Sequence, residues 1–181
     1  MPFADGDSRF ALGAGIAYNA AMETVYLETT VVGTIASRDH PDPIMLARQL
    51  STRKWWADAP ARFDLKISDL VIAECSAGDP TAAAERLAIV DGIDLVTPRE
   101  DAESLAEALL LGKAVPESEP RDAAHIALAA VHGLTYLVTW NFKHILNPHL
   151  QRRIGDICRE SGFIPATICT PEQLLESYDD T

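Results

Sequence analysis

The sequence predicts an α/β protein: a three-layer α/β/α sandwich built on a central parallel sheet of about five strands. From Met22 onward, short β-branched runs alternate with longer helical patterns, which is typical of strand–helix units and a parallel sheet. The 181 residues suit one domain, and 48% hydrophobic residues are enough for one core. We therefore expect a single folded domain over residues 22–181.

The first expected elements alternate between strand and helix. Residues 24–28 (TVYLE) are mostly apolar and predict a strand, and residues 43–57 predict a helix because apolar side chains recur on one face. The second strand is expected at 64–68 (DLKIS). It ends on Ser68, which suits the N-cap of a helix over 69–77.

Glycine and proline delimit the middle of the chain. Gly78 is expected to end the preceding helix, and Pro80 stands at the first position of the next, which runs to residue 91. A third strand at 94–96 precedes an amphipathic helix over 100–112.

The last third of the chain repeats the alternation. Pro120 is expected to begin a helix that Gly133 ends, and residues 135–139 (TYLVT) predict a fourth strand. The remaining elements are a helix over 148–162, a fifth strand over 166–169 and a short helix beginning at Pro171.

Residues 1–21 are expected to form a flexible N-terminal extension, because they are rich in Ala, Gly, Asp and Ser and lack a clear period. The alternative, an additional helix over 10–18 that covers part of the core, stays open. Asp5 and Asp7 do not fit a secretory signal, and no apolar run approaches the roughly 18 residues of a membrane span. We therefore expect a cytoplasmic protein.

The charge balance limits how this protein can bind a polyanion such as a nucleic acid. It has 15 basic and 27 acidic residues, a net charge of −12, which excludes nucleic-acid binding through a global positive field. Phosphate must be met locally, by a metal ion or a few basic side chains. The three cysteines have no CxxC spacing, so we expect neither a disulfide framework nor a zinc site, and Cys75 and Cys169 are expected in the core.

Four polar residues are expected at one edge of the sheet. In right-handed β–α–β units the strand C-termini and the helix N-termini share one rim, where α/β sheets bind ligands. Glu28 ends the first strand, Asn141 follows the fourth, and Asp122 lies in the first turn of the helix before the fourth strand. Glu74, in the helix after the second strand, can reach back toward this rim.

Such a cluster of carboxylates repels itself. At an effective dielectric near 20, two charges 4 Å apart repel by about 4 kcal/mol. Oxygen ligands suit a hard cation, so the sequence predicts Mg²⁺ or Mn²⁺ held by Glu28, Glu74 and Asp122. Taken singly, each residue also has an ordinary role: Asp122 as partner of the helix dipole, Glu74 as a partly exposed side chain, and Glu28 and Asn141 as turn residues.

Several segments together resemble the PIN domain family, and within it the VapC-type toxins of bacterial toxin–antitoxin pairs. The matching segments are VYLETTVVG (25–33), ISDLVIAECSAGD (67–79), DAAHIALAAVHGLTYLVTWNFKHILN (122–147) and ICTPEQLL (168–175). They span nearly everything after Met22, and the third is the most specific.

The resemblance implies a PIN-like nuclease domain with a metal-dependent endoribonuclease activity that leaves 5′-phosphate ends. It implies an acidic quartet at Glu28, Glu74, Asp122 and Asn141, a cognate antitoxin and a homodimer. The first and fourth positions are most often aspartate in the family, so Glu28 and Asn141 depart from its usual pattern. The activated water would be oriented by Asp122 or Glu74, and both choices stay open.

The departures at Glu28 and Asn141 keep a second hypothesis open, a catalytically silent PIN-like module that binds RNA or a protein. A third, a HAD-type phosphotransferase, requires an aspartate nucleophile with a second aspartate two residues later. The sequence Glu28-Thr29-Thr30 lacks both, so this hypothesis ranks last.

Basic residues concentrate in the segment that supplies two of the four candidates. Residues 63–119 hold 13 acidic and 4 basic residues, a net charge of −9, whereas residues 121–159 hold 2 acidic and 5 basic, a net charge of +3. The candidates for guiding RNA phosphates are Arg121, Lys143, Arg152 and Arg153, with ordinary solvated charges as the alternative.

Other residues have weaker signals. Ser68 and Thr139 can hydrogen-bond a carboxylate or a metal-bound water, or act as plain caps. His125 is either a ligand beside Asp122 or an ordinary buried histidine, and His144 is similar. Trp55 and Trp56 either stack on bases or pack, one in the core and the other partly exposed. The safer expectation is packing.

Overall fold

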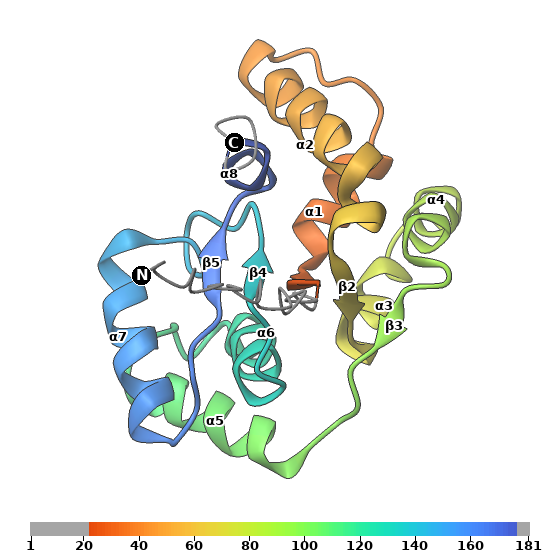
Figure 1. The fold of residues 1–181 in the computed structure, drawn as a ribbon. Coiled ribbons are helices and arrows are strands. Elements are labelled where there is room, and N and C mark those ends of the chain that lie inside the picture. The colour runs from red at the N-terminus through yellow and green to blue at the C-terminus, as the bar shows by residue number, and fades with distance from the viewer. Residues whose placement is uncertain (1–21, 177–181) are drawn as a thin grey trace, which may run out of the picture.

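The computed structural model describes residues 22–176 (Figure 1), which contain one sheet of five parallel strands. The strands are β1 (Thr24–Leu27), β2 (Asp64–Ile67), β3 (Asp94–Leu95), β4 (Tyr136–Val138) and β5 (Thr167–Cys169), in the spatial order β3-β2-β1-β4-β5. The expected fold class is thereby confirmed. The expected extension over residues 1–21 lies outside the described residues.

The helices form two layers, one on each face of the sheet (Figure 1). The first layer contains α1 (Thr29–Ala36), α2 (Pro43–Arg62), α3 (Asp69–Cys75), α4 (Pro80–Val90) and α8 (Pro171–Glu176). The second contains α5 (Glu100–Leu111), α6 (Pro120–Val131) and α7 (Pro148–Glu160). Helix α1 packs against α2 and α4, α2 packs against α8, and α5 packs against α6 and α7.

Strand β1 lies at the point where the chain reverses its direction across the sheet. From β1 the chain proceeds to β2 and β3 on one side, and it then returns to β4 and β5 on the other. In open α/β sheets, the crevice beyond the strand ends at such a point is where ligands bind. Leu27 pairs with Val138, so Glu28 and Thr139 follow two adjacent strand ends.

The core contains aromatic and aliphatic side chains from both layers. Trp55 is fully buried and packs against Phe63, with 6.4 Å between the ring centroids, whereas Trp56 is only partly buried. This confirms the expected division between the two tryptophans. Cys75, Cys158 and Cys169 are all buried and free, in agreement with the expectation for Cys75 and Cys169.

Helix α1 was not expected from the sequence. Its residues, TTVVGTIA, include β-branched side chains and a glycine, which have lower helix propensity. Two features compensate: Val31 and Val32 are fully buried, and the Glu28 side chain accepts a hydrogen bond from Thr30 N as the N-cap of the helix. Glu28 therefore begins a helix as well as following a strand.

The other element boundaries lie within a few residues of the expected ones. Helix α2 is the largest difference, because it continues to Arg62 through Pro60, which lies in its last turn. Ser68 is the N-cap of α3, as expected, with its Oγ accepting from Val71 N. Gly78 and Gly133 adopt positive φ values of 88° and 62° after α3 and α6, a conformation that glycine allows at helix ends.

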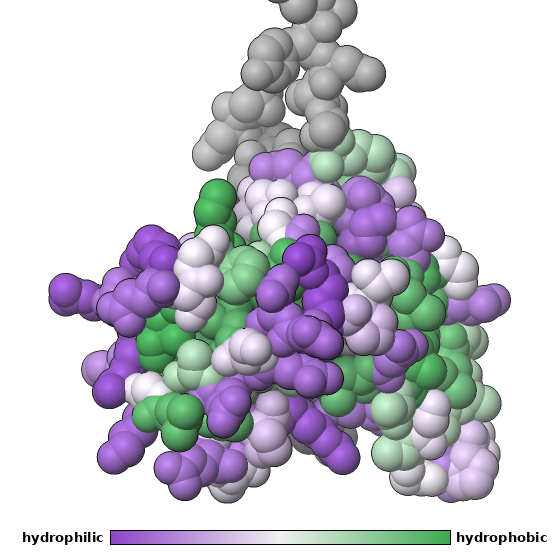
Figure 2. Space-filling model, turned by 90° about the horizontal axis from the view of Figure 1, so that it is seen from below, coloured by the Kyte–Doolittle hydropathy of each residue, from purple (hydrophilic) through white to green (hydrophobic). Residues whose placement is uncertain are grey.

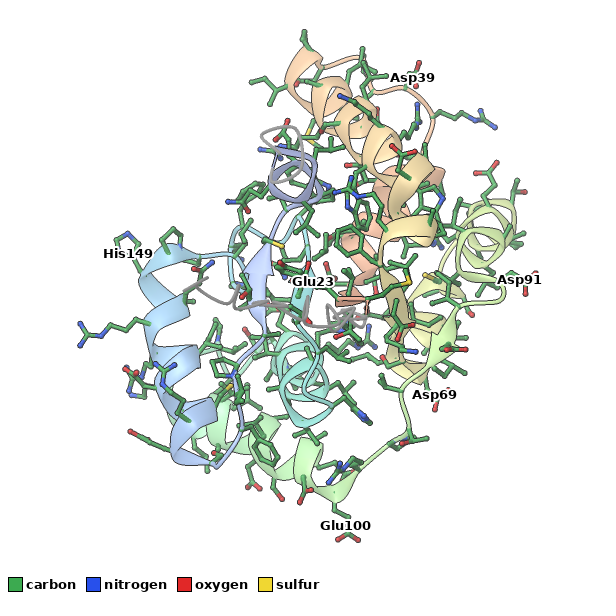
Figure 3. All side chains as sticks on the ribbon, viewed as in Figure 1. Glu23, Asp39, Asp69, Asp91, Glu100 and His149 are labelled. Carbon is green, nitrogen blue, oxygen red and sulfur yellow. The ribbon has the colours of Figure 1, made fainter. Side chains whose placement is uncertain are left out.

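The surface is rich in acidic side chains. Asp39, Asp69, Asp91 and Glu100 lie at the periphery (Figure 3). On the face shown in Figure 2, apolar patches are separated by hydrophilic side chains. None of the helices in residues 22–176 combines the length and apolarity that crossing a membrane requires.

Candidate functional site

Glu28 is buried, with 4% of its surface exposed, at the C-terminal end of β1. Its Oε2 atom accepts hydrogen bonds from Thr139 Oγ1 at 2.7 Å, from Thr30 N at 3.1 Å and from the Thr30 hydroxyl. The Thr139 hydroxyl in turn accepts from Asn141 N at 2.9 Å. The loop after β4 is thereby connected to the Glu28 carboxylate.

Glu74 extends from α3 to a neighbouring position at the same rim. Its Oε2 atom accepts hydrogen bonds from the Thr29 hydroxyl and from His125 Nε2, the latter at 3.0 Å. Since a carboxylate can only accept, His125 Nε2 carries the proton. The bond joins α3 in one layer to α6 in the other.

His125 is held on its other side by Tyr26. In the neutral imidazole with Nε2 protonated, Nδ1 accepts from Tyr26 Oη at 2.9 Å, so the Tyr26 hydroxyl accepts from Ser68 Oγ at 2.6 Å. A single direction of donation thus runs from Ser68 through Tyr26 and His125 to Glu74. Both nitrogens of His125 are used, so His125 orients Glu74 and has no lone pair left for a metal.

The groups around the Glu74 carboxyl favour its ionised form. Burial by itself raises the pKa of the Glu74 carboxyl, but the hydrogen bonds from His125 and Thr29, the charge of His125 when it is protonated and the positive charge of Arg121 outweigh it, so the pKa lies below its ordinary value. Burial raises the pKa of Tyr26 well above its ordinary value, so its hydroxyl keeps its proton at neutral pH.

Asp122 belongs to a second hydrogen-bonded group. Its Oδ2 accepts from His144 Nδ1 at 2.8 Å. The backbone N–H of His144 donates to Asn141 Oδ1 at 3.1 Å, which fixes the turn after β4. The amide oxygen of Asn141 therefore already has a donor, in keeping with a turn residue.

The four sequence candidates thus divide into two neighbouring groups. Potential ligand atoms of Glu28, Glu74 and His125 lie within 4.8 Å of one another, and those of Glu119, Asp122 and His144 do the same. Asp122 and His125 lie three residues apart on α6, and Thr139 and His144 lie on one loop. The structure brings Glu28 and Glu74 together and places Asp122 in the adjacent group.

The three carboxylates share one feature that bears on metal binding. In each, one oxygen (Oε2 or Oδ2) receives the hydrogen bonds described above. Within residues 22–176, the other oxygen of Glu28 and of Asp122 accepts no hydrogen bond, and that of Glu74 only faces Arg121 Nη1 at 3.8 Å. None of these three oxygens is a fully buried atom without a partner. Each carboxylate is therefore held in place by one oxygen and offers the other to a ligand.

Most of the basic candidates for binding RNA phosphates form no ion pair with the four candidate site residues in the described chain. Arg121 is 72% exposed and pairs with Glu74 at the rim. Lys143 and Arg153 are exposed, and the Arg152 Nε atom lies 3.9 Å from Asp156. No hydrogen bond or ion pair joins these last three residues to the four candidates within the described chain.

Ser68 and Thr139 were predicted either to hydrogen-bond a carboxylate or a metal-bound water, or to act as plain caps. Thr139 donates directly to Glu28, whereas Ser68 acts through Tyr26 and His125. Thr29, Thr30 and Tyr26 were not predicted from the sequence. Thr29 and Thr30 directly follow the candidate Glu28, but Tyr26 is a buried strand residue that sequence alone does not distinguish from core.

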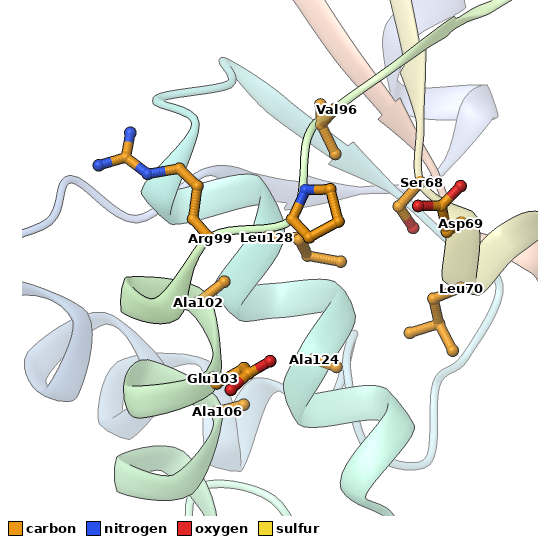
Figure 4. Close-up of a pocket in the computed structure, with 11 residues that line it drawn as sticks. Ser68, Asp69, Leu70, Val96, Arg99, Ala102, Glu103, Ala106, Ala124 and Leu128 are labelled. Carbon is orange, nitrogen blue, oxygen red and sulfur yellow. The ribbon is translucent and has the colours of Figure 1, made fainter.

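A separate apolar pocket of about 260 Å³ lies between the N-terminus of α3 and helices α5 and α6 (Figure 4). Its walls include Val96, Ala102, Ala124 and Leu128, and Ser68 is the only residue it shares with the hydrogen-bonded chain to Glu74. The four candidates are not among its lining residues.

Comparisons of the chain with protein-family models, with curated proteins and with solved structures each returned no match.

Proposed function

We propose that this protein is a metal-dependent endoribonuclease that hydrolyses RNA phosphodiester bonds. The observation that carries the proposal is the arrangement of Glu28, Glu74 and Asp122, each with one oxygen fixed by hydrogen bonds and the other available. The location beyond β1 and β4, at the chain reversal of the sheet, supports it. The resemblance to VapC-type PIN toxins is the second line of support.

The donor set fits Mg²⁺ or Mn²⁺. It offers carboxylate oxygens, and among the described residues no cysteine belongs to either group of potential ligands. Glu28 and Glu74 would hold the ion, and the adjacent Asp122 would contribute to its binding. A bound divalent ion supplies Lewis-acid polarisation of the phosphate and lowers the pKa of a bound water.

The remaining catalytic roles would fall to side chains of the protein. Glu28 is fixed by Thr30 and Thr139, and Glu74 by Thr29 and His125, so neither carboxylate has to reorganise when substrate binds. Asp122, held by His144, would orient the attacking water and accept its proton. Arg121, beside Glu74 at the rim, would contact a substrate phosphate.

The biological setting follows from the resemblance. We infer that the protein acts in the cytoplasm as the toxin of a toxin–antitoxin pair, with a cognate antitoxin as partner, and that it forms a homodimer.

A cleavage assay tests the proposal. The full chain is incubated with single-stranded RNA and Mn²⁺, beside Asp122→Asn and the exposed-site control Asp91→Asn. We expect cleavage by the wild type and the control, and a loss of at least about a hundredfold in Asp122→Asn. Equal cleavage by Asp122→Asn, or none by the wild type, contradicts the proposal.

One observation favours a catalytically silent binding module instead. Glu28 already has a structural role as the N-cap of α1, which accounts for its burial without a metal. For a silent module, Mn²⁺ neither raises the melting temperature nor supports cleavage.

A further inference from the structure

A groove of about 790 Å³ lies beside the candidate site, between α2, α7, α8 and the loop after β4. We call it the Arg48 groove. The lining residues that matter here are Arg48, Trp140, Phe142, Gln151, Thr170 and Gln173. None of them is used by the catalytic proposal.

The Arg48 groove is joined to the candidate site through Trp140. The backbone N of Trp140 donates to Thr30 Oγ1 at 2.9 Å, and the same hydroxyl donates to Glu28. The Trp140 indole N–H donates to Thr52 Oγ1 at 2.9 Å, which fixes the ring. Asn141 is the next residue in the chain. A molecule in the groove would therefore lie next to a phosphate bound at Glu28.

The floor of the groove is a cation–aromatic cluster. The Trp140 and Phe142 rings lie 5.8 Å apart, and Phe142 is 44% exposed. The Cζ atom of Arg48 lies 4.8 Å from the Phe142 centroid and 5.6 Å from that of Trp140. Among the described residues Arg48 forms no ion pair with a carboxylate, and its Nη1 contacts Met45 Sδ at 3.7 Å. An arginine that forms no ion pair is thus held on two aromatic faces, in a groove whose lining also includes the acidic Glu172.

The polar residues of the groove offer hydrogen-bonding edges. The Gln173 Oε1 atom accepts from Thr170 N at 2.9 Å, whereas its amide N–H₂ has no acceptor among the described residues. The Gln151 side chain makes no hydrogen bond there either. Side-chain amides of this kind match the edge of an unpaired base, which presents both donors and acceptors.

The net charge of −12 gives a reason why RNA binding would need a site such as the Arg48 groove. A protein with this charge repels RNA at long range, so binding must come from short-range contacts. Stacking on aromatic rings and guanidinium planes provides them for any base, provided that the base is unpaired. On the basis of the proposed nuclease function, we propose that the Arg48 groove stacks one unpaired nucleobase of single-stranded RNA next to the scissile phosphate.

The test measures binding separately from cleavage. A labelled single-stranded RNA 12-mer is titrated with the full chain in EDTA, and fluorescence polarisation gives Kd. We expect Arg48→Gln and Phe142→Ala each to weaken binding about tenfold, and Phe142→Tyr, which keeps a ring, to bind like the wild type. If Phe142→Ala does not fold, Phe142→Leu replaces it in the titration, because it also removes the ring. An RNA duplex of the same sequence should bind at least about tenfold more weakly.

Two controls match the chemistry removed. Arg99→Gln removes an arginine paired with Asp101 on α5, and Ile164→Ala removes an apolar side chain that is 81% exposed. Both should bind RNA like the wild type. Equal affinity of Arg48→Gln and Phe142→Ala with the wild type overturns the proposal, and so does equal affinity for the duplex. A changed oligomeric mass with unchanged RNA affinity also overturns it, because the groove is then a protein contact.

The two proposals fail in different ways. RNA binding in EDTA that depends on the Arg48 groove, without any Mn²⁺-dependent cleavage, contradicts the nuclease proposal alone. Cleavage with an unchanged KM in Arg48→Gln and Phe142→Ala contradicts the groove proposal alone.

Discussion

The Nε2 atom of His125 lies 3.0 Å from Oε2 of Glu74, although the two residues are 51 positions apart and lie in opposite helical layers. The same histidine is bonded to Tyr26, and Tyr26 to Ser68. These bonds link α6, β1, the N-terminus of α3 and the part-buried Glu74 carboxylate in one network, which determines the orientation of Glu74.

Tyr26→Phe tests this network. The substitution keeps the ring but leaves buried His125 Nδ1 without a partner and removes the acceptor of the Ser68 hydroxyl, which keeps only its bond from Val71 N. We expect a cost of about 1–3 kcal/mol in the free energy of unfolding. Urea denaturation measures it, and Mn²⁺ affinity should fall as well because Glu74 is less well fixed. Tyr136→Phe is the control. Its hydroxyl donates to Glu23 in a part-buried position, so a smaller loss is expected. An equal loss of unfolding free energy in Tyr26→Phe and Tyr136→Phe would contradict a stabilising role of the Tyr26 hydrogen bonds.

The lowered pKa of Glu74 predicts a pH dependence of stability. The pKa is below its ordinary value of 4.5 in the folded protein, so the unfolded chain binds the proton more tightly. The stabilisation from ionised Glu74 is therefore fully present above pH 4.5 and is lost as the pH falls toward the folded-state pKa.

Urea midpoints between pH 7 and pH 3 measure this effect, with Glu74→Gln for comparison. The wild type should lose more stability over the acidic range than Glu74→Gln, which cannot ionise at this position. Parallel curves for the two proteins would mean that the Thr29 and His125 bonds do not favour the charged form.

Two glycine substitutions test the packing of the second layer. A Cβ atom on Gly112, at the end of α5, would collide with Ile157 of α7 and lie 2.9 Å from the Ala108 carbonyl oxygen. Gly112→Ala should cost about 1–3 kcal/mol of unfolding free energy, because the backbone oxygen cannot move aside easily. Gly33→Ala in α1 meets nothing within 4 Å and should stabilise by about 0.5–1 kcal/mol. Thermal denaturation measures both variants. The melting temperature should fall in Gly112→Ala and rise in Gly33→Ala, and a change of the same sign in both would contradict the prediction.

The sequence predicted the sheet well because its signals are local and periodic. Alternating strand and helix patterns, Ser68 as a cap, and Gly78 and Gly133 as helix ends all have a direct physical basis in the chain. Helix α1 was missed because its β-branched residues are stabilised by burial and by the Glu28 cap, which are tertiary effects.

The candidate site was predictable only in part. The rule that strand C-termini and helix N-termini share one rim predicts that Glu28, Glu74 and Asp122 approach one another. It contains no information on which hydrogen bonds each side chain makes. The division into a group with His125 and a group with His144 therefore comes only from the structure, since the sequence leaves each histidine open as a ligand or an ordinary buried residue.

Binding of Mn²⁺, measured by isothermal titration calorimetry on the full chain, tests the central claim most directly. Glu28→Gln, Glu74→Gln and Asp122→Asn are compared with the wild type and with Asp91→Asn, an exposed acid outside the site. We predict saturable Mn²⁺ binding in the wild type and the control, weakened at least about tenfold in each of the other three variants. Wild-type protein that binds no Mn²⁺, or three site variants that bind it as tightly as the control, would contradict a shared metal centre.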